Sequence, residues 1–226
     1  IAEARKNHLH IDWANYTPSQ PKVSGVTVFD DYDLAELIKY IDWTPFFYTW
    51  ELKGTYPRLL QDPQLGETAR GLYNDAQSML RRVIDEQWLT AKAVIGLWPA
   101  NAIGDDIEIY ADTERTAVRT TLHTLRQQMP RRDNGRPNFA LADFVAPKET
   151  GLVDAIGAFV LTTGLGIEPH VKAFEDNHDD YSAIMLKAVA DRLAEAFAER
   201  IHQRVRKEIW GYAPEETLDN DALILE

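Results

Sequence analysis

Residues Asp180 to Trp210 read DYSAIMLKAVADRLAEAFAERIHQRVRKEIW, the longest uninterrupted helical pattern in the chain. The stretch contains no proline, and Gly211 directly after it supplies a natural helix end. Its apolar residues recur every three or four positions, which is typical of a helix that buries one face. We therefore expect a long helix near residues 180–210. Its apolar stripe comprises Ile184, Met185, Val189, Leu193, Phe197, Ile201 and Val205.

Further helices and several β-rich runs come before this stretch. A short helix is predicted at Leu34–Ile41, after an acidic segment that suits a helix N-terminus, and a long one at Glu67–Leu89. Residues 106–110 alternate polar and apolar side chains, as a half-buried strand does. The predicted strands are Ala93–Trp98, Asp106–Ala111, Ala117–Leu122, Phe139–Val145 and Ala155–Thr163, with a solvated loop at Arg131–Pro137.

The order of these elements predicts the fold class. Helices, then strands, then helices favour an α+β protein with a mostly antiparallel sheet covered by helices. We expect one domain over residues 31–226, preceded by an extended N-terminal arm or linker over residues 1–30. The 226 residues suffice for a domain of this size.

The composition excludes several classes of function. A net charge of −12 opposes binding to nucleic acid and to anionic membrane surfaces. No cysteine is present, which rules out disulfides, thiolate zinc sites and iron–sulfur ligation. No apolar stretch reaches the length of a membrane span. We expect no nucleic-acid or membrane partner, and a cytoplasmic location fits the absence of cysteine.

The segment Tyr40-Ile-Asp-Trp-Thr-Pro-Phe-Phe-Tyr-Thr-Trp50 places one carboxylate among large aromatic side chains. Aromatic faces attract cations, and Asp42 beside them could complete a site for a positively charged ligand. A core strand or turn rich in large side chains explains the same pattern. The residues of this segment alone leave both interpretations open.

Other patterns carry less chemistry. Thr163-Gly-Leu-Gly-Ile-Glu168 lacks the third glycine of a dinucleotide fingerprint and predicts a tight turn before a helix. The histidines have no metal-binding spacing, and no nucleophile elbow occurs, so we expect neither a metal site nor a covalent catalyst. Asp191, Glu195 and Glu199 share one face of the long helix, with arginines near enough to pair with them. A solvated acidic stripe explains them, although Glu195 is expected to be the most embedded of the three.

Seven segments follow one another in order along nearly the whole chain. They are Tyr40-Ile-Asp-Trp-Thr-Pro-Phe-Phe47, Tyr56-Pro-Arg58, Gly104-Asp-Asp-Ile-Glu-Ile-Tyr110, Leu141-Ala-Asp-Phe-Val-Ala-Pro147, His178-Asp-Asp-Tyr181, Ala190-Asp-Arg-Leu-Ala-Glu-Ala-Phe-Ala198 and Trp210-Gly-Tyr-Ala-Pro214. Together these segments resemble the C-terminal activation domain of cobalamin-dependent methionine synthase. The ordered set is specific, although no single segment decides it.

The resemblance implies a C-shaped α+β domain on a twisted antiparallel sheet. It implies that the domain binds S-adenosylmethionine and presents the methyl group for reductive methylation of cob(II)alamin, which keeps the methyltransferase active in methionine biosynthesis. Asp42 and Glu195 match the family's S-adenosylmethionine contacts, with a positioning rather than a catalytic role, and Asp191 matches a contact to the partner domain. The implied partners are the cobalamin-binding domain of the same polypeptide, which holds the cobalamin, and a flavodoxin or similar reductase.

One departure from the family pattern limits these expectations. The family continues with an Arg-Pro-Ala-Pro-Gly-Tyr-type segment that also grips S-adenosylmethionine, and this sequence stops at Glu226 without it. We expect a truncated domain that is not active alone. The alternative is a docking module that covers a cobalamin-binding domain or an electron donor and binds no small molecule by itself.

Overall fold

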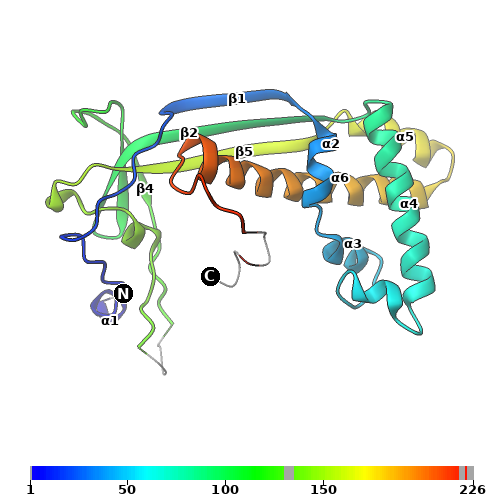
Figure 1. The fold of residues 1–226 in the computed structure, drawn as a ribbon, viewed down its shortest axis with the longest axis horizontal. Helices are drawn as coiled ribbons and strands as arrows, with labels where there is room; N and C mark the ends of the chain where they lie inside the picture. Colours follow the sequence, from blue (N-terminus) through cyan, green and yellow to red (C-terminus); the bar gives the residue numbers. More distant parts are fainter. Residues whose placement is uncertain (1, 130–134, 219–221, 223–226) are drawn as a thin grey trace. The chain divides into compact units, whose positions relative to one another are not determined.

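The computed structural model describes residues 2–129, 135–218 and 222. These residues form an α+β fold with an open, mostly antiparallel sheet, as the sequence predicts (Figure 1). The predicted loop at 131–137 lies largely outside the described residues. The helices are α1 (Ala2–Lys6), α2 (Leu34–Leu37), α3 (Trp43–Thr49), α4 (Gly66–Asp85), α5 (Ile167–Asp176) and α6 (Asp180–Arg204).

Five strands make up the sheet within the described residues. The order is β1-β2-β3-β4, and β5 pairs with β2. Strand β1 is not among the predicted strands and lies mostly in the expected N-terminal arm. Strand β2 is much longer than the predicted Ala93–Trp98, and β5 is only slightly longer than the predicted Ala155–Thr163. The strands are β1 (Gly25–Tyr32), β2 (Thr90–Ile103), β3 (Asp106–Tyr110), β4 (Val118–His123) and β5 (Asp154–Leu165).

The chain divides into two compact units. Unit 1 contains residues up to 27, residues 95–158 and those from 205 onward, and unit 2 contains residues 28–94 and 159–204. Strands β1, β2 and β5 each contribute residues to both units. The expected start of the domain at residue 31, and its expected C-shape, stay predictions.

Unit 1 is built on the antiparallel ribbon of β2, β3 and β4. Ile103 faces Asp106 across a two-residue turn, in which Gly104 takes a left-handed conformation that suits the hairpin. Ile107 and Ile109 point into the core, as the alternation in the sequence predicts. The core cluster contains Ala100, Ala102, Ile107, Ala142 and Val145, with Ile156 packed against it.

Unit 2 is organised around α6. Its buried face includes Leu186, Leu193 and Phe197. The Phe197 ring packs against Tyr32 of β1, with ring centroids 4.6 Å apart. The Thr163 hydroxyl of β5 donates to the Ala190 carbonyl at 3.0 Å. Helix α6 therefore lies along the strands in this unit, with α4 and α5 also against it (Figure 1).

Two predicted helices end where the backbone leaves the helical conformation. Helix α4 stops at Asp85, four residues before the predicted end, because Gln87 is left-handed and the Trp88 N–H donates to the Val83 carbonyl. Helix α6 ends at Arg204 and continues as a short π-helical turn to Ile209. Gly211, with φ +78°, then closes the stretch as predicted.

One predicted strand is wrong. Residues 141–144, inside the expected strand Phe139–Val145, form a 3₁₀ turn with Leu141 and Phe144 exposed. The Asp143 carboxylate accepts the Ala140 N–H at 2.9 Å and so closes this turn. A local hydrogen bond of this kind competes with extended structure.

The turn between β5 and α5, at Gly166, can be tested by substitution. Gly166 has φ +96°, and a Cβ there would lie 2.7 Å from the Trp88 carbonyl oxygen. Gly166→Ala should therefore lower the free energy of unfolding by about 2 kcal/mol or more, because a left-handed alanine is strained and its methyl group has no room. Urea unfolding measures the change.

Gly164→Ala is the matched control. A Cβ at Gly164 meets nothing within 4 Å, so this variant should keep nearly the stability of the original protein. Equal stabilities for the two variants would contradict the assigned turn.

Candidate functional site

The structure places Asp42 at the N-cap of α3. Its Oδ1 atom accepts the Thr44 N–H at 2.8 Å. Pro45 is tolerated here because the first helical turn has no intrahelical partner for its N–H groups. The side chain of Asp42 is otherwise exposed to solvent, so the cap fixes the carboxylate without burying it.

The aromatic neighbours of Asp42 belong mostly to the core. Trp43, Phe46 and Phe47 are buried on one side of α3, and the Trp43 ring makes an edge contact with Phe46. Only Tyr48 is exposed among the aromatic residues within α3. The segment is a helix rather than a strand or turn, and its aromatic residues support the carboxylate more than they surround a ligand.

The two predicted site carboxylates on α6, Asp191 and Glu195, are both exposed. The side chains of Asp191 and Glu195 are 72% and 60% accessible. The expectation that Glu195 is the most embedded of the three is wrong: Glu195 is exposed although Ala196 beside it is buried, and Glu199 is the half-buried one. Arg192 pairs with both carboxylates, as the sequence predicts: its Nη2 lies 2.7 Å from Asp191 Oδ2 and 3.3 Å from Glu195 Oε2.

The segment that carries Asp42 is anchored to α6 at both ends. The Tyr40 hydroxyl donates to Gln203 Oε1 at 2.7 Å. The Trp50 ring packs on Tyr181, with centroids 5.0 Å apart. Burial and a hydrogen bond to Asp75 raise the pKa of Tyr181 to about 12, so its hydroxyl stays protonated. The structure thus brings together the two elements that carry Asp42 and Glu195.

A second anchor joins α2 to α6. The Arg200 Nε atom lies 2.6 Å from Glu36 Oε1 and donates to the Tyr32 hydroxyl at 3.2 Å. Burial alone would raise the pKa of Glu36, but the hydrogen bonds from Tyr32 and Arg200 outweigh it and lower the pKa. Sequence reasoning missed this contact, since the partners lie more than 160 residues apart and no local pattern links them.

The carboxylates beside β3 have structural partners. Glu108 pairs with Lys148 at 2.7 Å, and Asp106 lies 3.0 Å from the His123 ring. Asp105 joins a network described below. These contacts support the interpretation of this stretch as an acidic turn rather than a binding site.

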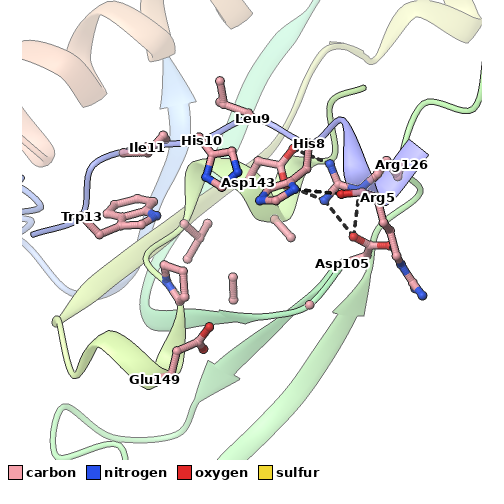
Figure 2. Close-up of a pocket in the computed structure, with 15 residues that line it drawn as sticks. Arg5, His8, Leu9, His10, Ile11, Trp13, Asp105, Arg126, Asp143 and Glu149 are labelled. Carbon is pink, nitrogen blue, oxygen red and sulfur yellow. Dashed lines mark hydrogen bonds and ion pairs between the residues drawn. The ribbon is translucent and has the colours of Figure 1, made fainter. Parts of the chain in front are cut away.

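A cavity of about 320 Å³ lies in unit 1 (Figure 2). His8, His10 and Trp13 from the N-terminal segment line it together with Asp143 and Glu149 (Figure 2). A second cavity, of about 440 Å³, adjoins β1 and the end of α4 in unit 2. The predicted site residues Asp42, Asp191 and Glu195 line neither cavity.

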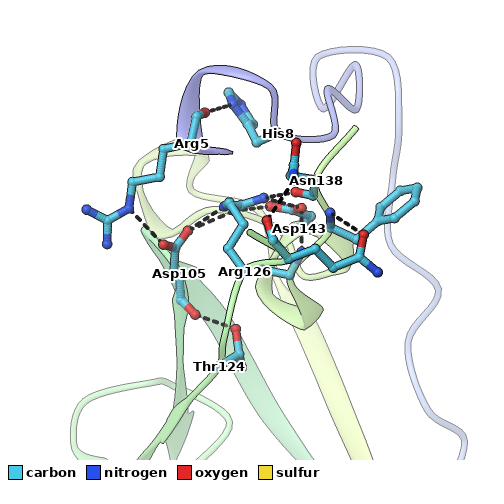
Figure 3. A network of polar contacts seen from close by, with 10 residues as sticks. Arg5, His8, Asp105, Thr124, Arg126, Asn138 and Asp143 are labelled. Atoms are coloured by element: carbon cyan, nitrogen blue, oxygen red, sulfur yellow. Dashed lines mark hydrogen bonds and ion pairs between the residues drawn. The ribbon is translucent and has the colours of Figure 1, made fainter. Parts of the chain in front are cut away.

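A buried ion network adjoins the first cavity (Figure 3). Arg126 Nη2 lies 2.6 Å from Asp143 Oδ1 and 2.8 Å from Asp105 Oδ1, and Nη1 donates to the Asn138 carbonyl. Burial opposes the charge on both carboxylates, but the hydrogen bonds from arginine outweigh it and lower the pKa of each. Because every member has a partner, the network serves the fold of unit 1 rather than a ligand.

The structure adds two findings on metals and membranes. Across residues 2–129 and 135–218, no three side chains of metal-binding type come together as a metal site. None of the helices in those same stretches has both the length and the hydrophobicity that a bilayer span requires.

The fold and these exposed carboxylates define an α+β domain with a candidate site for a cationic ligand. A profile of the vitamin B12-dependent methionine synthase activation domain matches residues 33–226. The crystal structure of the MetH reactivation domain bound to AdoHcy is 51% identical in sequence and superposes with a TM-score of 0.94. The match covers all of this chain and 68% of that one.

The chain therefore belongs to the activation-domain family of vitamin B12-dependent methionine synthase. This finding confirms the family that the seven sequence segments indicate, and with it the α+β fold class.

The N-cap of α3 gives a stability test at Asp42. Asp42→Ala should cost about 1 kcal/mol of unfolding free energy, because the Thr44 N–H loses its acceptor. Asp42→Asn should cost much less, since asparagine caps helices as well as aspartate. Thermal and urea unfolding of the two variants test the cap, and equal losses would contradict it.

The buried network in unit 1 gives a test with a defined pH dependence. Arg126→Met should lose about 3–5 kcal/mol at pH 7, because it leaves two buried carboxylates without a counter-charge. Arg5→Met is the control: Arg5 is exposed and also pairs with Asp105, so its loss should cost only about 0–1 kcal/mol.

The pKa shifts fix the sign of the pH effect. The folded-state pKa values of Asp105 and Asp143 lie below the ordinary 3.8, so their stabilisation is complete above that value and is lost as the pH falls through the lower folded values. The loss of unfolding free energy caused by Arg126→Met, relative to the original protein, should therefore become smaller between pH 7 and pH 3. A deficit that is constant across this range would contradict the assignment.

Proposed function

We propose that this chain binds S-adenosylmethionine through Asp42 and Glu195 and presents its methyl group to cobalamin held by another domain. The observation that carries the proposal is the pair of exposed carboxylates on two contacting elements, α3 and α6, in a chain similar to a domain bound to AdoHcy. S-adenosylmethionine carries an ammonium and a sulfonium group. Carboxylates hold an ammonium group by charge-assisted hydrogen bonds.

The geometry supports a positioning role for the residues of this chain. Asp42 is fixed by its cap and Glu195 by Arg192, so both carboxylates are oriented before a ligand arrives. Neither carboxylate needs to exchange a proton, because a methyl transfer from sulfonium requires only the correct approach of the two reacting atoms. When it is bound by its own domain, reduced cobalamin supplies the electron pair that accepts the methyl group.

The proposal extends to the partners. The cobalamin-binding domain would meet the face of α6 that carries Asp191, and a flavodoxin or similar reductase would supply the electron. The activity would maintain a methyltransferase of methionine biosynthesis in the cytoplasm. The exposure of Asp191 supports its assignment as a contact to the partner domain.

Calorimetric titration of the full-length protein tests the ligand contacts. Asp42→Asn and Glu195→Gln should each weaken S-adenosylmethionine binding by about 10- to 100-fold, because a hydrogen bond to a charged group contributes roughly 1.5–3 kcal/mol. Asp42→Asn keeps the helix cap, so a lower affinity would not reflect unfolding. Unchanged affinity in both variants would refute the proposed contacts.

A second ligand separates the two cationic groups. S-adenosylhomocysteine keeps the ammonium and lacks the sulfonium charge. If the carboxylates hold the ammonium, each variant should weaken the binding of both ligands by similar factors. Asp191→Asn should weaken retention of the cobalamin-binding domain, because Asp191 is assigned to the contact with that domain. Retention of that domain by a protein that binds neither ligand would favour the docking-module alternative.

A further inference from the structure

Arg192 stands out among the buried charged residues in the described parts of the chain. Its side chain is only 10% accessible, yet both carboxylates that it contacts are largely exposed. Arg126 shows the opposite pattern, because the side chains of its partners Asp105 and Asp143 are only 14% and 5% accessible. A guanidinium group is costly to desolvate, and exposed ion pairs return little of that cost. Stability alone therefore explains Arg126 better than Arg192.

The position of Arg192 on α6 is fixed by two contacts already described. Tyr181, Arg192 and Gln203 are separated by equal steps of 11 residues, each of which is roughly three helical turns. They therefore share one face of α6. Tyr181 meets Trp50 at one end of that face and Gln203 meets Tyr40 at the other, so Arg192 lies midway along α6 between the two anchors of the Asp42 segment.

From this position one nitrogen of Arg192 forms hydrogen bonds with the carboxylates of both Asp191 and Glu195. Nη2 donates to Asp191 Oδ2 and to Glu195 Oε2. Within the described residues, no hydrogen bond engages the other Glu195 oxygen, Oε1. Asp191 and Glu195 are like charges four residues apart and would otherwise repel each other. The contact thus restricts the long Glu195 side chain and leaves one oxygen available to an outside donor.

We infer that Arg192 is a positioning residue for the ligand site, which orients the Glu195 carboxylate toward the ammonium group of an S-adenosyl ligand. This inference rests on the proposed function, since it assumes that Glu195 contacts the ligand. Arg192 does not touch the ligand in this account. Arg192 restricts the rotamers of Glu195 before the ligand binds, so that less side-chain entropy is lost on binding and the affinity is higher.

Electrostatic attraction alone and positioning of Glu195 predict opposite changes in the affinity for S-adenosylmethionine when Arg192 is replaced in Arg192→Met. The variant removes a positive charge beside two carboxylates, so attraction alone would make the cation S-adenosylmethionine bind more tightly. If Arg192 positions Glu195, binding should instead weaken by about three- to tenfold, the effect of one side chain that must be immobilised. Arg192→Lys keeps the charge without the planar fork and should recover part of the loss.

A double-mutant cycle in the full-length protein decides between these accounts. S-adenosylmethionine titrations compare Arg192→Met, Glu195→Gln and the combined variant. If Arg192 acts through Glu195, the combined variant should bind within about twofold of Glu195→Gln alone. Additive losses, or binding by Arg192→Met that equals or exceeds that of the original protein, would overturn the inference.

The same titrations separate this inference from the proposed function. If Glu195→Gln binds as tightly as the original protein, the ligand contact itself is wrong, and the role of Arg192 fails with it. If Glu195→Gln binds weakly while Arg192→Met does not, only the inference about Arg192 fails. Circular dichroism and thermal unfolding accompany each variant. If Arg192→Met proves unstable, Arg192→Lys replaces it in the cycle. An affinity below that of the original protein, with no further loss when Arg192→Lys is added to Glu195→Gln, supports positioning. An affinity of Arg192→Lys equal to that of the original protein contradicts it.

Discussion

The stability of unit 2 depends on the packing of its other elements against the apolar face of α6. Leu186, Leu193 and Phe197 are inaccessible to solvent, and strands β1 and β5 and helices α2 to α5 all have contacts with this helix. Each fully buried leucine or phenylalanine contributes roughly 1.5–3 kcal/mol through the hydrophobic effect. Because one helix organises so many partners, the directions of its remaining side chains are set by the core rather than by the site.

The polar faces of α6 inherit their positions from this packing. Arg200 reaches Glu36 and Tyr32 on one side, and Gln203 reaches Tyr40. Asp191 and Glu195 remain exposed, although Arg192 between them is buried. The same burial that stabilises unit 2 therefore decides which carboxylates of α6 can meet a ligand or another domain.

Sequence reasoning succeeded where structure is determined locally. The alternation at Ile107 and Ile109 in β3 reports a buried face directly. The apolar repeat in α6 does so at five of its seven positions, but Ile184 is exposed and Val205 lies beyond the end of the helix. It failed at residues 141–144, where an apolar run looked like a strand and the Asp143 carboxylate closes a turn instead. Asp143 is also held by Arg126, a partner 17 residues earlier in the chain that no period in the sequence reveals.

The candidate site shows the same division. Asp42 is marked by the family resemblance alone. Its position as the cap of a short helix was not predicted, although such a cap is a local feature. The environment of Glu195 could not be predicted, since the surrounding alanines suggested burial and only the packing of α6 shows which side faces solvent. The pairing of Tyr40 with Gln203 likewise depends on the fold, because 163 residues separate the partners.

The two carboxylates of the proposed site share one physical property. Asp42 gives one oxygen to the Thr44 N–H, and Glu195 gives one to Arg192. An ionised carboxylate offers about four acceptor positions, so neither contact exhausts its capacity to bind an ammonium group. Each contact instead removes conformational freedom before binding, which lowers the entropy cost that a ligand would otherwise meet. A helix cap and a buried arginine, which elsewhere in proteins serve stability, here also determine the direction in which the carboxylates face.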